Sequence, residues 1–115
     1  MKINRFEDIV VWQKSKNLAT IIYKLFKTNS DYSFRDQIQR AVISISNNIA
    51  EGFERKSNKE LTKFLFIAKG SCAELRSMMY IAKELGYVNE KNTNEILENC
   101  EEISRMISGF IKSIM

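Results

Sequence analysis

Five polar side chains are the candidates for chemistry in this sequence: Arg40, Asn47, Asn48, Glu51 and Glu74. Arg40, Asn47 and Glu51 follow helical spacing within one segment, and Glu74 lies in the next predicted helix. An arginine with two carboxylates could form an acid–base or ligand site. Buried charges require partners, so the same set could instead be a hydrogen-bonded network that fixes helix register or a subunit boundary. We favour the structural network.

The absence of histidine excludes several kinds of catalytic site. Glu-x-x-His di-iron centres, Ser–His and Cys–His nucleophiles and histidine-dependent ribonucleases all need it. Two scattered cysteines make no zinc site, and four isolated glycines make no phosphate-binding loop. We therefore expect no enzymatic activity, cofactor, metal or small-molecule substrate. An enzyme that uses Arg40 and Glu51 is the least favoured alternative, since it needs a pocket in which Glu51 has a perturbed pKa.

Basic residues are concentrated near the start of the chain. Residues 1–30 hold six Lys/Arg against two Asp/Glu, whereas residues 87–115 hold three against five. The two ends could be complementary neighbours, within or between subunits, or the basic end could bind a polyanion. No recognised nucleic-acid-binding motif is present. If several subunits assembled into a ring, however, the basic surface would be repeated in each subunit and the number of phosphate contacts would multiply. The candidate nucleic-acid-binding residues are Lys16, Lys24, Lys27 and Arg35.

Composition and patterning predict one helical domain over residues 1–115. Apolar residues make up 44% and charged residues 28%, proline is absent, and glycine occurs four times. No run reaches the roughly 18 apolar residues of a membrane span, and the N-terminus lacks an apolar signal segment. We therefore expect a cytoplasmic protein without a membrane role. Cys72 and Cys100 are expected to be buried and reduced rather than paired.

Apolar periodicity and capping residues divide the chain into four helices. The expected helices cover about residues 8–27, 33–52, 58–85 and 90 to near the end of the chain. Ser33 is the expected N-cap of the second, Gly52 its end, and Ser57 with Glu60 a capping box for the third. Three short links predict an all-α, antiparallel up-down-up-down bundle, and a heptad in the third helix predicts a left-handed twist.

Two helices carry a second apolar stripe. On the first helix, Trp12 and Tyr23 belong to a stripe that either broadens the core or contacts another subunit. On the third, a seam rich in small residues lies across from the heptad. A four-helix bundle cannot cover both sides of its own helix, so we favour a neighbouring subunit there. The candidate interface residues are Phe66, Gly70, Ala73, Ser77 and Ile81.

Several motifs in this order resemble one family. They lie at residues 6–9, 11–14, 37–41, 44–52 and 67–75 and include Asn-Ile-Ala-Glu-Gly and Ala-x-Gly-Ser-x-x-Glu-Leu. The chain resembles the bacterial four-helix bundle proteins associated with intervening sequences of large-subunit ribosomal RNA genes, often described as ribosomal proteins. It differs in lacking a proline in the first interhelix link and in carrying Ser46 where proline is common.

The resemblance implies a homopentamer without established enzymatic activity. It also implies kinship to the accessory protein of diversity-generating retroelements, a pentameric barrel that binds a reverse transcriptase and nucleic acid and is more basic than this chain. The shared motifs carry over no binding residue. Our prediction is a non-enzymatic homo-oligomer, a pentamer, that binds RNA or a nucleoprotein through its basic surface. The alternative is a protein-binding scaffold with no nucleic-acid role.

Overall fold

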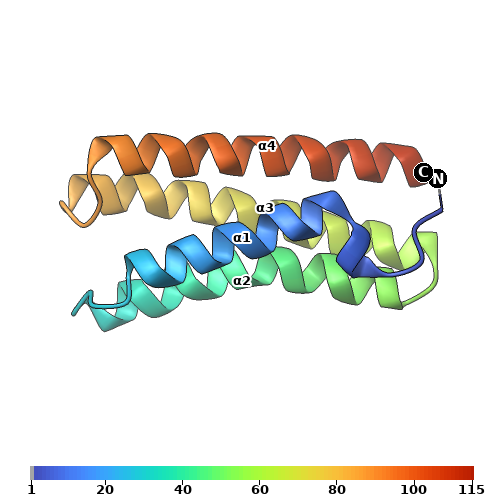
Figure 1. Cartoon of the computed structure of the whole chain (residues 1–115), viewed down its shortest axis with the longest axis horizontal. Coiled ribbons are helices and arrows are strands. Elements are labelled where there is room, and N and C mark those ends of the chain that lie inside the picture. The colour runs from blue at the N-terminus through green and yellow to red at the C-terminus, as the bar shows by residue number, and fades with distance from the viewer. Residues whose placement is uncertain (1) are drawn as a thin grey trace.

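The computed structural model describes residues 2–115 as a short 3₁₀ turn followed by four α-helices (Figure 1). The elements are η1 (Phe6–Asp8), α1 (Val10–Leu25), α2 (Tyr32–Glu54), α3 (Asn58–Glu84) and α4 (Glu90–Ile114). The helices lie along the long axis of a body that measures 43 × 22 × 20 Å. The expectation of an all-helical chain with four helices is confirmed.

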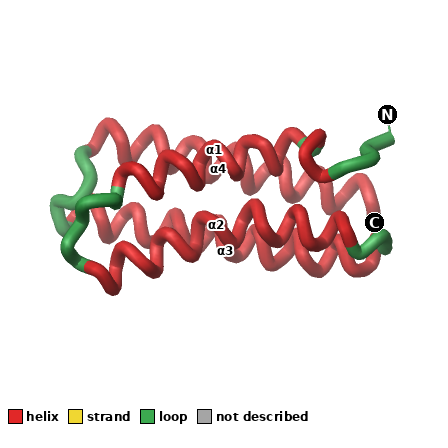
Figure 2. Tube along the Cα trace, turned by 60° about the horizontal axis from the view of Figure 1, so that its bottom comes forward, coloured by secondary structure: helices red, strands yellow, loops and turns green. Residues whose placement is uncertain are grey.

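Each helix packs against the one that follows it, and α4 returns to pack against α1. Among the described residues α1 makes no backbone contact with α3, nor α2 with α4, so these two pairs are the diagonals of the bundle. The α1–α2 and α3–α4 loops lie at one end, and the α2–α3 loop lies at the other with both termini (Figure 2).

The predicted apolar seams form the core. Ile38, Val42, Ile45 and Ile49 of α2 are completely buried, as is Leu65 of α3. On α4 the apolar periodicity predicts that Phe110 and Ile114 belong to the seam, but the structure buries Ile111 and leaves those two only partly buried. The buried thiols of this core are free, and the Sγ of Cys72 donates to the carbonyl oxygen of Cys100 at 3.1 Å.

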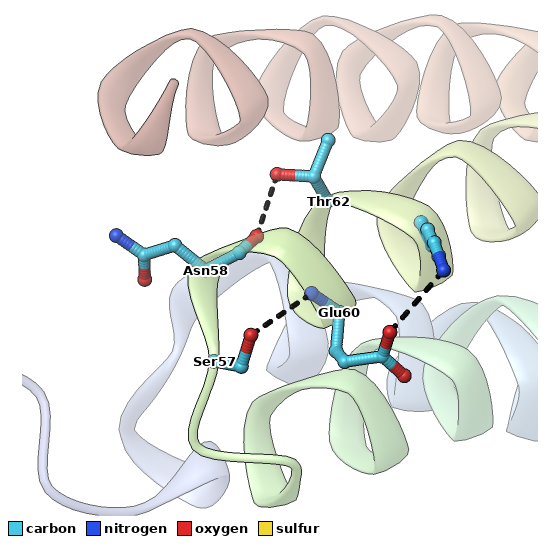
Figure 3. A network of polar contacts seen from close by, with 5 residues as sticks. Ser57, Asn58, Glu60 and Thr62 are labelled. Atoms are coloured by element: carbon cyan, nitrogen blue, oxygen red, sulfur yellow. Dashed lines mark hydrogen bonds and ion pairs between the residues drawn. The ribbon is translucent and has the colours of Figure 1, made fainter.

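Side-chain caps set the starts of three helices. The Oγ of Ser57 accepts from the backbone N–H of Glu60 at 3.3 Å, as the capping box predicts (Figure 3). Asn89 caps α4 by accepting from the backbone of Asn92. For α2 the prediction of Ser33 is wrong: the helix begins two residues earlier than that cap requires, and Asp31 accepts from Phe34.

Gly52 does not end the second helix, contrary to the prediction from its position. It is buried inside α2, which continues to Glu54, and the left-handed backbone occurs instead at Lys56, with φ of 59°. Gly86, by contrast, has φ of +76° and follows α3, in the left-handed conformation that suits a glycine just beyond a helix.

None of the helices within residues 2–115 combines the length and the apolar character needed to cross a bilayer.

Candidate nucleic-acid interface

A groove between α1 and α2 collects the basic residues predicted to bind nucleic acid. One stretch, of about 460 Å³, is lined by Lys16 and Lys24. The adjoining stretch, of about 320 Å³, is lined by Lys24, Lys27 and Arg35. Lys24 and Tyr23 line both stretches, so the two are continuous. We call this feature the α1/α2 groove. The fold therefore brings all four predicted residues together along one surface.

Aromatic and aliphatic side chains line the same groove. Trp12 and Tyr23 reach it from α1, and Ile43 from α2. The ammonium of Lys16 lies 5.7 Å from the centre of the Trp12 ring. The Phe6 ring packs edge-on against the same Trp12 ring, with 5.0 Å between the ring centres. The surface thus alternates cationic and apolar groups, the combination that binding sites for nucleic-acid strands use.

The charge of the α1/α2 groove is uncompensated along its walls. Within the described residues no carboxylate lines either of its stretches. The opposite side of α1 differs: Lys14 pairs with Glu102 of α4 at 3.3 Å, and Glu95 lines the groove there. The basic first helix and acidic last helix are therefore neighbours within one chain, and Lys24 lies at the boundary, since it lines the α4-side groove with Glu95 as well as the α1/α2 groove.

One carboxylate does approach a groove cation from outside its walls. Arg35 Nε lies 3.5 Å from Asp36 Oδ1, and the Arg35 guanidinium also stacks 4.8 Å from the centre of the exposed Tyr32 ring. Of the other basic residues, Arg55 pairs with Glu51 at 2.8 Å near the far end of α2, and it does not line the groove.

The five candidate polar residues do not form one network within the chain. Asn48 donates to the carbonyl and the Oγ of Ser44, whose hydroxyl lies 2.8 Å from that of Ser71 on α3. Separately, Glu74 accepts from Gln37 at 2.6 Å.

The remaining members lie apart from those contacts. Glu51 pairs with Arg55, the residue that follows α2, while Arg40 and Asn47 are exposed on α2. Asn47 lines the α1/α2 groove instead. The hydrogen bonds of Asn48 and of Glu74 are therefore two separate clusters, and each joins α2 to α3. No group of His, Cys, Asp and Glu within residues 2–115 could hold a metal ion.

The candidate interface residues form an exposed strip on α3. Phe66 is 54% exposed and Ile81 48%, and a side chain added at Gly70 would meet no atom within 4 Å. The strip faces away from the bundle centre, across from the buried heptad. We call it the α3 strip, and its members are Phe66, Gly70, Ala73, Ser77 and Ile81.

Trp12, Tyr23 and Ile43 are groove residues that the sequence interpretation did not assign to a binding site. A signal was available on α1: Trp12, Lys16, Ala19, Tyr23 and Lys27 recur at steps of four, three, four and four, which interleaves aromatic and basic side chains on one face. Ile43 could not be assigned in this way, because its place depends on how α2 lies beside α1.

These features define a class of protein: a four-helix chain with a basic, aromatic-lined groove on one side and an apolar strip on another. A family model described as 23S rRNA-intervening sequence protein matches residues 7–109. The chain belongs to this family, which confirms the resemblance drawn from its motifs.

A solved structure shows the same fold. It is a crystal structure of a protein of unknown function from the S23 ribosomal protein family of Bacteroides thetaiotaomicron. It aligns with a TM-score of 0.83 and 25% sequence identity over 90% of this chain and 96% of that one. No curated protein matches the chain.

Proposed function

We propose that this protein is a non-enzymatic, homo-oligomeric accessory protein of the cytoplasm that binds RNA or a nucleoprotein through the α1/α2 groove. One observation carries the proposal: four cations, from α1, the turn after it and α2, line one continuous groove that no carboxylate of the described chain lines. Lysine and arginine on such a surface neutralise phosphates and release counterions. The family's link to ribosomal RNA and the free, buried thiols, which suit a reducing compartment, also support it.

The α3 strip supports the oligomeric part of the proposal. Its exposed apolar side chains gain by being covered, and Gly70 leaves room for a second helix to approach. Because α3 has no contact with α1 in the described chain, a subunit seated on the strip leaves the α1/α2 groove open. Closed assembly with five copies, as the family resemblance implies, would display five grooves and steepen the salt dependence of binding.

A titration of labelled, structured RNA with salt tests this function. We compare the parent with a variant that carries Lys16→Ser, Lys24→Ser and Lys27→Ser. The matched control carries Lys59→Ser, Lys91→Ser and Lys112→Ser, which changes the net charge equally at exposed lysines that line neither stretch of the groove.

The groove variant should lose affinity about tenfold or more and about three units of the log–log salt slope, roughly one for each lysine, while the control keeps both. Equal loss in the two variants would show that only net charge matters. If the parent binds no RNA even at low salt, the protein-binding scaffold becomes the better interpretation.

A further inference from the structure

The α1/α2 groove has more apolar surface than phosphate binding alone would use. Tyr23 is 41% exposed and Ile43 37%, and they face the same stretch as Trp12 and Lys16. Trp12 and Tyr23 are eleven residues apart on one helix, which places them ~16 Å apart along its axis. A ligand that covers this stretch must therefore offer flat apolar faces as well as negative charge.

A fully paired RNA helix does not offer them. Its bases are stacked on each other inside the duplex, and a protein surface meets phosphates, 2′-hydroxyls and a shallow minor groove. Against a duplex, the lysines would find partners but Tyr23 and Ile43 would remain without a flat surface to cover them. Unpaired nucleotides differ, because their base faces are free to stack on aromatic side chains.

We propose that the α1/α2 groove takes single-stranded RNA, with an unpaired base stacked on Tyr23 beside Ile43 and the strand running along the same stretch past Trp12. The phosphates on either side of that base are neutralised by Lys16 and Lys24, and the strand continues toward Lys27 and Arg35. Recognition is independent of base sequence, since every base has a flat face to stack. This inference rests on the proposed function and names the kind of RNA that the groove binds.

The test compares three polyanions on the intact protein: a single-stranded oligouridine, a fully paired RNA duplex of the same length and inorganic polyphosphate. Trp12 is the only tryptophan of the chain and lines the same stretch of the groove, so its fluorescence reports whether the bases of a bound strand occupy that stretch. We expect oligouridine to bind more tightly than either competitor and to quench this fluorescence. Polyphosphate carries the charge without bases and should leave it unquenched.

Three variants assign the effect to stacking. Tyr23→Ser should weaken oligouridine binding roughly tenfold and leave polyphosphate binding unchanged, whereas Tyr23→Phe should keep the affinity because the ring remains. The matched control is Ile21→Ser, which removes an exposed apolar side chain from the same helix on the side that faces α4. It should bind like the parent.

The experiment distinguishes a failure of the single-strand proposal from a failure of the proposed function. Equal, lysine-dependent affinity for all three polyanions, without quenching and without an effect of Tyr23→Ser, overturns the single-strand proposal and leaves the proposed function in place. If no RNA binds, both are overturned. In that case, quenching by an acidic, aromatic peptide would assign the groove to a protein partner.

Discussion

A Cβ atom placed on Gly52 would lie 2.6 Å from the Cβ of Phe64, a separation that two side chains cannot adopt. The α2 and α3 helices therefore approach each other at this point only because residue 52 has no side chain. The obstructing atom is the first carbon of the Phe64 side chain, which cannot swing away without moving the backbone of α3. The glycine thus fixes the spacing of two helices near the loop that joins them.

Gly52→Ala should destabilise the fold although alanine favours a helix. Overpacking costs about 1–3 kcal/mol, and the fixed Cβ of Phe64 places this site at the upper end, above the roughly 1 kcal/mol that replacing a helical glycine gains. Gly109→Ala is the control, because its added carbon meets no atom within 4 Å and the variant should be as stable as the parent or slightly more so. Urea unfolding followed by circular dichroism measures both. Equal midpoints for the two variants would contradict the close approach of α2 and α3.

Tyr87→Phe should make stability less dependent on pH. The Tyr87 hydroxyl donates to Asp31 Oδ2 at 2.6 Å, which joins the α3–α4 loop to the α1–α2 loop. This bond, with a second from the Phe34 backbone, lowers the pKa of Asp31 below its ordinary 3.8, and the bond to Asp31 with partial burial raises the pKa of Tyr87 above 10.0.

The carboxylate therefore stabilises the fold above pH 3.8 and stops doing so as pH falls through its lowered pKa. The Tyr87 hydroxyl stabilises the fold below pH 10.0 and stops doing so as pH rises through its raised pKa. The parent should exceed Tyr87→Phe in stability between these limits and converge with it outside them. Tyr80→Phe, at an exposed tyrosine, is the control. A constant difference at every pH would mean that the hydrogen bond is not its source.

The two thiols should react only when the protein opens. Cys72 and Cys100 are fully buried; the hydrogen bond between their side chains, with burial, raises the pKa of Cys100, while the same hydrogen bond lowers the pKa of Cys72. Because both side chains are buried, a reagent reaches them only when the core opens, so alkylation in the native state should be on the order of 10³-fold slower than in denaturant. Ser33→Cys adds an exposed thiol as an internal standard. Rapid native labelling of all three would show that the thiols are accessible.

Gly70→Leu should dissociate the proposed assembly while leaving the helices intact. The position is open within one chain, so leucine meets no obstacle there, but it would block a second helix seated on the α3 strip. Native mass and far-ultraviolet circular dichroism measure the two effects. Gly109→Leu adds the same side chain at another open glycine, on α4, and should keep the parent's mass. Unchanged mass for Gly70→Leu would remove the strip as the subunit contact.

Local patterns in the sequence were sufficient for most of the fold. Heptad and 3.6-residue spacings are repeated many times, so a single misplaced residue does not change the predicted seam, and Ser57 and Asn89 cap their helices through contacts only three residues away. The N-cap of α2 was harder to predict, because Asp31 and Ser33 both have side chains that can cap a helix. Contacts from outside the helix favour Asp31: Asn29 Oδ1 accepts from its backbone, and Tyr87 bonds its side chain.

The sequence by itself determined four amphipathic helices, their order and the basic character of the first. Only the tertiary structure decided that α1 lies between α2 and α4, so that no carboxylate lines the α1/α2 groove while Glu95 and Glu102 line the grooves on the α4 side, one of which Lys24 also lines. It also decided that Ile43 completes an apolar floor and that Gly52 is a helix contact rather than a helix end. These properties depend on atoms from different helices, whose relative placement no pattern within one helix contains.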